Sequence, residues 1–348
     1  MRIRSHDEAV CQAAMILATM VALIIFALSP TNVAAAKCSG NFASDGPHAV
    51  DTSYDTWTDD RRQRSIPVKI YRPIVGGPRP VVIFSHGLGG SREAASYLGT
   101  GLASWGILAI HAQHPGSDRE VWRGITWPRA IRKALAKAVR NRQNAIDRFE
   151  DMPFIIDEIS RRASAGQLPV NLSQIGVAGH SFGAHSVLAA VGRLYPERGN
   201  DRGFADKRIR AGVALSPPAP GQRVSAAALK LIYSKIATPL LHLTGDNDKS
   251  PINASVKPAN RLIPFERIDR APQYAVVFKG GDHMVFSGRK RAWKRRSDKR
   301  IQDAVMYAAT VFFLAYLVDD DAARRQLNGP EFGCRFDEGD RVLRRNVE

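Results

Sequence analysis

The pentapeptide at residues 179–183 has the form in which a serine serves as a nucleophile. It reads G-H-S-F-G, with Ser181 at its centre, and in this G-x-S-x-G pattern the serine stands on a sharp turn between a strand and a helix. A serine hydroxyl is a poor nucleophile at neutral pH, so it needs an imidazole to take its proton and a carboxylate to orient that imidazole. The pattern also occurs by chance, and the residues around it decide its meaning.

The acid and the base are expected downstream of the serine, in the order Asp then His. The sequence G-D-N-D at residues 245–248 follows an apolar run and offers two aspartates. We favour Asp248, because the loop must extend several residues past its strand before a carboxylate can turn back, and Asp246 is then expected to brace the loop. The expected base is His283, which follows another apolar run and a pair of glycines that allow the chain to bend toward Ser181.

Acyl transfer also needs hydrogen-bond donors for the charged oxygen of its tetrahedral intermediate. The loop S-H-G-L-G-G at residues 85–90 stands at the end of an apolar run, where such donors are required. We therefore expect the backbone N–H groups of Leu88 and Phe182 to form the oxyanion hole. No metal ion or organic cofactor is implied, and the remaining histidines are expected to serve packing and local hydrogen bonds.

Predicted strands and helices alternate along the chain, as a doubly wound sheet requires. The strands are short apolar runs of the kind buried in parallel sheets, at residues 66–72, 80–85, 106–112, 174–179, 211–216, 239–244 and 274–279. Helical spacing covers residues 92–105, 141–162, 182–193 and 299–317, and only the two ends look irregular. The fold class is therefore α/β, with a mostly parallel sheet, helices on both faces and chemistry at the carboxyl ends of the strands.

Two basic segments do not fit this alternation. Residues 116–140 carry Trp122 and Trp127, and are interpreted either as a lid or binding loop or as a solvated excursion. Residues 289–300 hold eight lysines and arginines around Trp293. This second segment is interpreted as a solvated face leading into a helix, or as a membrane-contact surface, because a tryptophan among cations suits a lipid interface.

The first 36 residues have the pattern of a cleavable secretory signal. Arg2 and Arg4 precede an apolar run at residues 13–28, and three alanines end at residue 36. We therefore expect residues 37–348 to form a single exported domain, periplasmic or secreted. The alternative is an uncleaved N-terminal anchor, for which the apolar run is near the lower length limit.

Two cysteines, Cys38 and Cys334, fall within the expected mature domain. An oxidising compartment favours a disulfide between them, and two unpaired thiols are the alternative. The disulfide would tie the mature N-terminus to the C-terminal tail. Closing so long a loop would stabilise the folded protein by roughly 5 kcal/mol in the chain-entropy model.

The chain has 50 lysines and arginines against 33 aspartates and glutamates, a formal net charge of +17. Anionic surfaces such as membrane headgroups or envelope polymers would attract such a protein. The cations are scattered and no recognised nucleic-acid motif accompanies them, so nucleic acid is not an expected partner. The expected partners are a small-molecule or lipid ester substrate and an anionic surface.

The loop F-S-H-G-L-G at residues 84–89, the pentapeptide around Ser181 and the loops of Asp248 and His283 resemble those of the plasma-type platelet-activating-factor acetylhydrolase group. The resemblance covers most of the chain from about residue 66 to residue 317 and implies the α/β-hydrolase fold. The acid and base loops also resemble those of bacterial cutinase-like polyester hydrolases. The chain is further similar to predicted dienelactone hydrolases, although true members of that activity use a cysteine at the position of Ser181.

Residues and resemblance together predict a serine hydrolase that cleaves carboxylic esters, of short acyl, lipid or polyester type, through an acyl-enzyme intermediate. A thioesterase, amidase or peptidase with the same three residues is the alternative, because these residues define acyl transfer and not the leaving group. A different class is a non-catalytic envelope protein that binds lipid and has kept the fold. A fluorophosphonate probe distinguishes the classes, since only an active hydrolase reacts with it.

Overall fold

The structure is a computed structural model that describes residues 42, 45–197, 200–218, 224–253, 256–288 and 296–347. Residues Gly40–Glu348 make one compact unit. The expected secretory signal, Cys38 and the greater part of the second basic segment, residues 289–295, lie outside the described residues. Cleavage of the signal and pairing of Cys38 with Cys334 therefore remain predictions.

A nine-stranded sheet runs through this unit in the order β1-β2-β4-β3-β5-β8-β9-β10-β11. The six strands from β4 to β10 in this order are parallel to one another, while β2 is antiparallel to both its neighbours and β11 is antiparallel to β10. This confirms the mostly parallel α/β sheet predicted from the sequence. The strands are β1 (Val50–Asp59), β2 (Arg64–Pro73), β3 (Arg79–Ser85), β4 (Leu108–Ala112), β5 (Val170–His180), β8 (Ile209–Leu215), β9 (Leu240–Asn247), β10 (Gln273–Asp282) and β11 (Arg341–Arg345), and β6 (Tyr195–Glu197) pairs with β7 (Asn200–Arg202) in a separate hairpin.

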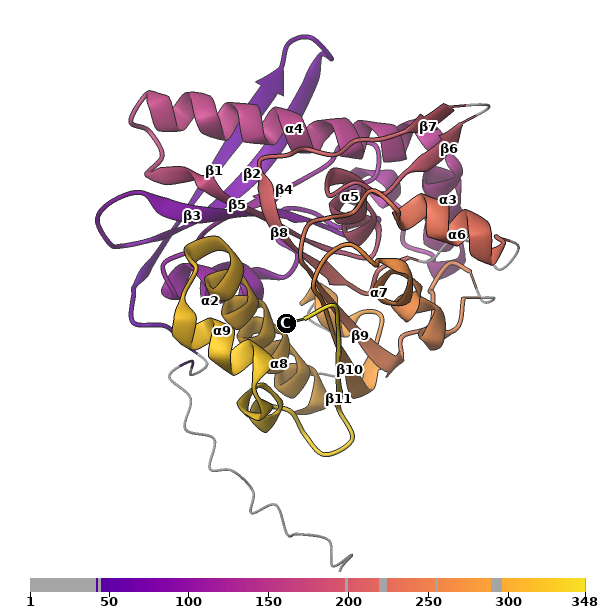
Figure 1. Cartoon of the computed structure of the whole chain (residues 1–348). Coiled ribbons are helices and arrows are strands. Elements are labelled where there is room, and N and C mark those ends of the chain that lie inside the picture. Colours follow the sequence, from indigo (N-terminus) through magenta and orange to yellow (C-terminus); the bar gives the residue numbers. More distant parts are fainter. Residues whose placement is uncertain are drawn as a thin grey trace, which may run out of the picture. The chain divides into compact units, whose positions relative to one another are not determined.

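Helices cover both faces of the sheet, and Figure 1 shows α2, α8 and α9 on one side and α4 and α5 on the other. Alternate residues of β3 explain why: Val82 and Phe84 join the core beneath α2 and α8, whereas Val81 and Ile83 join the core beneath α4 and α5. A strand buried on both faces is apolar over its buried centre, and residues 80–84 of β3 are apolar and buried. The helices are α2 (Ser96–Ser104), α3 (Pro128–Arg140), α4 (Arg142–Ser164), α5 (Phe182–Ala190), α6 (Ala226–Tyr233), α7 (Ile263–Arg267), α8 (Arg296–Phe313) and α9 (Asp321–Asn328).

The helix α8 continues through a π-helical turn at Leu314–Val318. Within the described residues, Asp298–Val318 is the one helical stretch long and apolar enough to cross a membrane, but 78% of its most apolar window is buried inside the protein. Its apolar side chains pack into the core on the α2 face of the sheet. The stretch is therefore the core helix of this layer.

The sequence pattern misses several elements at the two ends, and the expectation that the ends are irregular is wrong. Strand β1 forms one edge of the sheet, α9 follows α8, and β11 forms the other edge. The two edge strands are rich in polar or charged residues, which suits an exposed edge but gives no apolar run. The first basic segment, residues 116–140, also contains regular structure: a 3₁₀ turn, η1 (Arg119–Trp122), and the helix α3.

Candidate active site

Ser181 occupies the sharp turn between β5 and α5. Its backbone has φ 54° and ψ −111°, a conformation that costs energy for any residue with a side chain. A Cβ atom added at Gly183 would overlap the carbonyl oxygen of Ser85, and one added at Gly179 would overlap the backbone of Gly183. The two glycines of the motif therefore let the turn pack directly against the end of β3.

Ser181, His283 and Asp248 form a hydrogen-bonded row at the carboxyl ends of β5, β10 and β9. The Ser181 Oγ atom lies 2.9 Å from Nε2 of His283, and Nδ1 of His283 lies 2.8 Å from Oδ1 of Asp248. His283 is 7% exposed and Asp248 is fully buried. In the tautomer that fits this row, Nδ1–H donates to Asp248 and Nε2 can accept the serine proton.

The loop of Asp248 is held against the loop of His283 by Asp246. The Oδ1 atom of Asp246 accepts a hydrogen bond from the Gly280 backbone N–H at 2.7 Å. A Cβ atom at Gly245 would overlap the carbonyl of Gly281, so the two loops touch through their glycines. The structure thus places Asp248 against the histidine and Asp246 in the bracing position.

The carboxylate of Asp248 has further partners that the sequence analysis did not identify. Its Oδ2 atom accepts hydrogen bonds from the Ser216 hydroxyl and, at 2.9 Å, from the Thr244 hydroxyl. Burial acts to raise the pKa of Asp248, but the hydrogen bond from His283 and the positive charge of Arg261 hold that pKa below its ordinary value. Asp248 is therefore ionised at neutral pH, as an orienting acid must be.

Arg261 is the least expected member of this group. It comes from the 3₁₀ turn η2 (Pro258–Leu262), is 3% exposed, and places Nε 3.3 Å from Oδ1 of Asp248. Its Nη2 atom lies 3.1 Å from Nδ1 of His283. When Nδ1 carries a hydrogen, both groups are donors, so the arginine and the histidine share the same carboxylate rather than bond to each other.

The loop that carries Leu88 is held by hydrogen bonds to Ser117 and Trp122. The Gly89 N–H donates to the Ser117 carbonyl at 2.9 Å, and the Trp122 indole N–H donates to the Gly89 carbonyl at 2.9 Å. A Cβ atom at Gly87 would come within 2.9 Å of Nδ1 of His180, so the loop lies directly against the G-H-S-F-G motif. Phe182 begins α5, and the N–H groups of a first helical turn have no carbonyl partner within their own helix.

The other buried histidines make structural hydrogen bonds. His180 Nε2 lies 2.9 Å from the His283 carbonyl oxygen, His111 Nδ1 lies 2.9 Å from the Ala94 carbonyl oxygen, and His242 Nε2 lies 2.8 Å from Oε1 of Gln273. Burial lowers the pKa of His180 and of His111 to about 3, and that of His242 to about 4. These side chains are therefore neutral in the folded protein at neutral pH.

Because these histidines are buried in the neutral form, we expect the protein to lose stability in mild acid. Their folded-state pKa lies below the unfolded value, so their contribution is complete above about pH 6.5 and is lost as the pH falls toward 4 for His242 and toward 3 for His180 and His111. Each group should remove up to about 1.4 kcal/mol of unfolding free energy per pH unit in that range. Urea unfolding at pH 7, 6 and 5 measures the effect, and His111→Gln should reduce the slope by about one proton. Equal stability at pH 7 and pH 5 would contradict the prediction.

Part of the chain matches a known protein family. The matched residues, 63–122, run from the start of β2 through β3, the Leu88 loop, α2 and β4 to Trp122. They include the proposed donor Leu88 and end before Ser181. Over residues 63–122 the chain matches the family described as platelet-activating factor acetylhydrolase, isoform II, and this match, together with the mostly parallel α/β sheet, supports a hydrolase of the lipase and esterase type.

Proposed function

We propose that the protein hydrolyses carboxylic esters through an acyl-enzyme formed on Ser181. The observation that supports this most directly is the row from Ser181 Oγ through His283 to Asp248, with distances of 2.9 and 2.8 Å. These are hydrogen-bond distances suited to proton transfer between a nucleophile and its base.

In the first half of the reaction, Nε2 of His283 takes the proton of Ser181 as its Oγ attacks the ester carbonyl carbon. The carbonyl oxygen becomes negative and accepts hydrogen bonds from the N–H groups of Leu88 and Phe182. His283 then gives its proton to the departing alcohol. Asp248 stays ionised and stabilises the imidazolium between these two steps.

In the second half, a water molecule replaces the alcohol. His283 takes a proton from the water as its oxygen attacks the acyl carbon, and the same two N–H groups hold the second oxyanion. Collapse of this intermediate breaks the bond to Ser181 Oγ, which recovers its proton from His283. The products are the free acid and an unchanged enzyme.

The test is hydrolysis of p-nitrophenyl acetate, butyrate and palmitate, with Ser181→Ala as the control and a fluorophosphonate as a covalent probe. The proposal predicts ester turnover and labelling of the wild-type protein, both lost in the variant. Turnover of thioesters or amides, but not of esters, would mean that the same residues act on substrates with a different leaving group. Absence of both labelling and turnover would favour the non-catalytic lipid-binding alternative.

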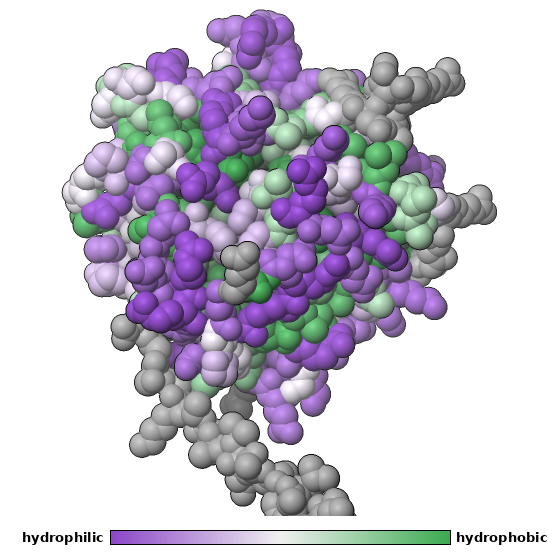
Figure 2. Space-filling model, in the orientation of Figure 1, coloured by the Kyte–Doolittle hydropathy of each residue, from purple (hydrophilic) through white to green (hydrophobic). Residues whose placement is uncertain are grey.

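We also propose export by cleavage after residue 36, and contact of the helix α3 with an anionic membrane surface. The five cations of α3 are exposed, and within the described part of the chain none of them forms an ion pair. Trp127, directly before α3, is 77% exposed. The cations are Arg129, Arg132, Lys133, Lys137 and Arg140. The face drawn in Figure 2 is largely hydrophilic, with separate hydrophobic areas. Because the whole chain carries a net charge of +17, a test must separate general attraction from the effect of α3.

Reversing charge on α3 should weaken binding to anionic vesicles. The variant Arg132→Glu, Lys133→Glu, Lys137→Glu should lose about 100-fold in affinity for phosphatidylglycerol vesicles, because each basic side chain near such a surface contributes about 1 kcal/mol. The measurement is vesicle cosedimentation at fixed salt.

A matched control reverses three exposed cations elsewhere, Lys230→Glu, Lys235→Glu and Arg270→Glu, with the same change of net charge. It should lose less than about fivefold, since only long-range attraction is reduced. Equal losses in the two variants would contradict a specific role of α3.

A further inference from the structure

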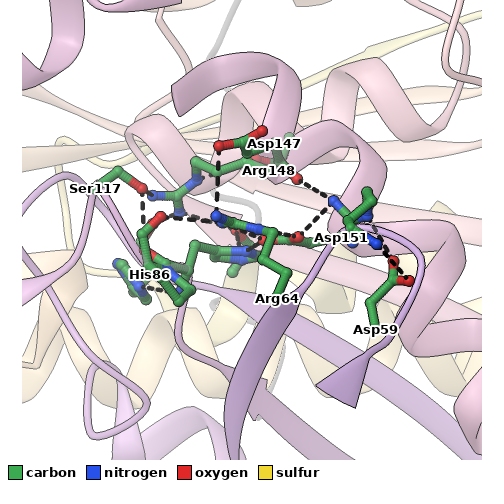
Figure 3. Close-up of polar contacts among 12 residues, drawn as sticks. Asp59, Arg64, His86, Ser117, Asp147, Arg148 and Asp151 are labelled. Atoms are coloured by element: carbon green, nitrogen blue, oxygen red, sulfur yellow. Dashed lines mark hydrogen bonds and ion pairs between the residues drawn. The ribbon is translucent and has the colours of Figure 1, made fainter. Parts of the chain in front are cut away.

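Arg148 places a guanidinium in the interior of the protein, beneath the loop of Leu88 and the start of α5. It belongs to α4, and its side chain is fully buried. Figure 3 shows this guanidinium pointing toward Ser117 and His86, with Arg64 and Asp151 beside it. Burying a charged side chain costs free energy. The residues that contact Arg148 therefore indicate what its guanidinium holds in place.

On one side Arg148 holds the loop that carries Leu88. Its Nη2 atom donates to the His86 carbonyl and, at 3.1 Å, to the Ser85 hydroxyl, and Nη1 donates to the Ser117 hydroxyl at 2.9 Å. Ser117 in turn accepts the Gly89 N–H through its carbonyl. One planar group therefore fixes the chain both before and after Leu88.

On the other side the same group contacts the first turn of α5. The guanidinium carbon lies 4.7 Å from the centre of the Phe182 ring, a cation–π contact, and Nε lies 3.4 Å from the Ser186 hydroxyl. Phe182 carries the second proposed oxyanion donor. Arg148 is thus in contact with both segments whose N–H groups must converge on one oxygen atom.

A chain of hydrogen bonds behind Arg148 orients the Ser85 hydroxyl. Ser85 Oγ lies 2.9 Å from Nε2 of His114, and Nδ1 of His114 lies 2.8 Å from Oδ2 of Asp151. The row resembles that of Ser181, but all three side chains are fully buried, so no substrate can reach it. Each donor in this row has an acceptor when Arg148 donates to the Ser85 hydroxyl, that hydroxyl donates to Nε2 of His114, and Nδ1–H of His114 donates to Asp151.

The charge of Arg148 has no direct carboxylate partner: among the described residues no ion pair joins it to an aspartate or glutamate. Asp151, which belongs to the same network, is engaged by Arg62, Arg64 and His114 instead. Burial lowers the pKa of Arg148 to about 9, against the opposing charges of Asp151 and Asp118. The group is therefore still a cation at neutral pH.

We propose that Arg148 is the positioning residue of the oxyanion hole: it fixes the Leu88 loop and the first turn of α5 relative to each other, and it adds a positive charge behind them. The inference rests on the proposed function, because it concerns the same reaction. Arg148 does not touch the substrate. It acts through the two backbone N–H groups, and its effect should therefore appear in the tetrahedral intermediate rather than in substrate binding.

The test compares Arg148→Met and Arg148→Lys with Arg64→Met. Arg64 serves as the control because it belongs to the same buried network, bonding Asp151, Asp147 and the Pro115 carbonyl, without a hydrogen bond to the Leu88 loop or to α5. The measurements are kcat and KM for p-nitrophenyl butyrate, the inhibition constant of an alkyl trifluoromethyl ketone, which forms an oxyanion on Ser181, and the urea midpoint.

For Arg148→Met we expect kcat to fall about 30-fold with KM within about threefold, and affinity for the ketone to fall in parallel. Arg148→Lys keeps the charge but not the planar fork, and should lose about tenfold in kcat. Arg64→Met should lose stability but less than about threefold in kcat. If Arg148→Met does not fold, Arg148→Lys carries the comparison.

Unchanged kcat and ketone affinity in the folded Arg148 variants, or equal losses in Arg64→Met, would refute the positioning role while leaving the ester hydrolase intact. A wild-type protein that neither hydrolyses the ester nor binds the ketone would refute the proposed function, and the role of Arg148 with it. The wild-type measurement therefore separates the two failures.

Discussion

Replacing Ser181 with alanine is expected to lower kcat for p-nitrophenyl butyrate by about 10⁴-fold to 10⁶-fold while KM changes only a few-fold. The reason is that the Ser181 Oγ atom, 2.9 Å from Nε2 of His283, is the only group in the row able to form the acyl bond. Substrate contacts and the oxyanion hole remain, so a small residual rate over water should persist.

His283→Ala and the double variant sharpen this test. If the two residues act as one unit, the double variant should be no slower than the slower single variant, whereas independent roles would multiply the losses. Ser85→Ala is the matched control, because Ser85 has the same arrangement with His114 and Asp151 but is fully buried. It should lose less than about tenfold and keep fluorophosphonate labelling. Labelling that survives in Ser181→Ala would assign the nucleophile to another residue.

The positions of Ser181, Asp248 and His283 could be predicted because each directly follows an apolar strand. The carboxyl ends of parallel strands meet at one edge of a sheet, so residues 35 and 102 positions apart along the chain are brought together by strand order alone. The glycines of these loops also indicate that the loops pack closely together, since a side chain at Gly183 or Gly245 would overlap the backbone of a neighbouring loop.

Arg261 and Arg148 could not be predicted in the same way. Arg261 stands in a segment without an apolar pattern, and Arg148 lies on a helix that carries many charged residues, only some of which are buried. Which cation turns inward depends on packing between elements distant in sequence. Ser216 is different: it ends a predicted strand, so the rule that located Asp248 gives a signal that could have identified it.

The edge strands are missing from the sequence-based fold for a related reason. A central strand such as β3 is buried on both faces and shows an apolar run, but an edge strand needs few apolar side chains. In β1 the main apolar anchor is Trp57, which is 1% exposed, and its neighbours are polar. Periodicity therefore finds the strands that position the site and misses those that only close the sheet.

Asp248→Asn is expected to lower kcat by about 10³-fold to 10⁴-fold, whereas Asp246→Asn should change it less than about threefold. The amide of asparagine can still face Nδ1 of His283, but it carries no charge to stabilise the imidazolium that forms when Ser181 loses its proton. The matched change at Asp246 keeps an acceptor for the Gly280 N–H, so the loop brace survives. Rates measured between pH 6 and 9 separate the two variants, and the reverse pattern would assign the acid to Asp246.

Arg261 should make the fall in kcat of Asp248→Asn larger than the loss of one hydrogen bond to His283 would cause. In Asp248→Asn the guanidinium that lies 3.1 Å from Nδ1 of His283 loses its negative partner, and its charge repels the imidazolium that forms when Ser181 gives up its proton. Adding Arg261→Met to Asp248→Asn should therefore recover part of the lost kcat, about fivefold to tenfold, although Arg261→Met alone should reduce activity. A double variant slower than Asp248→Asn would mean that Arg261 serves mainly to hold η2 in place. Recovery would show that the aspartate both orients the histidine and neutralises this arginine.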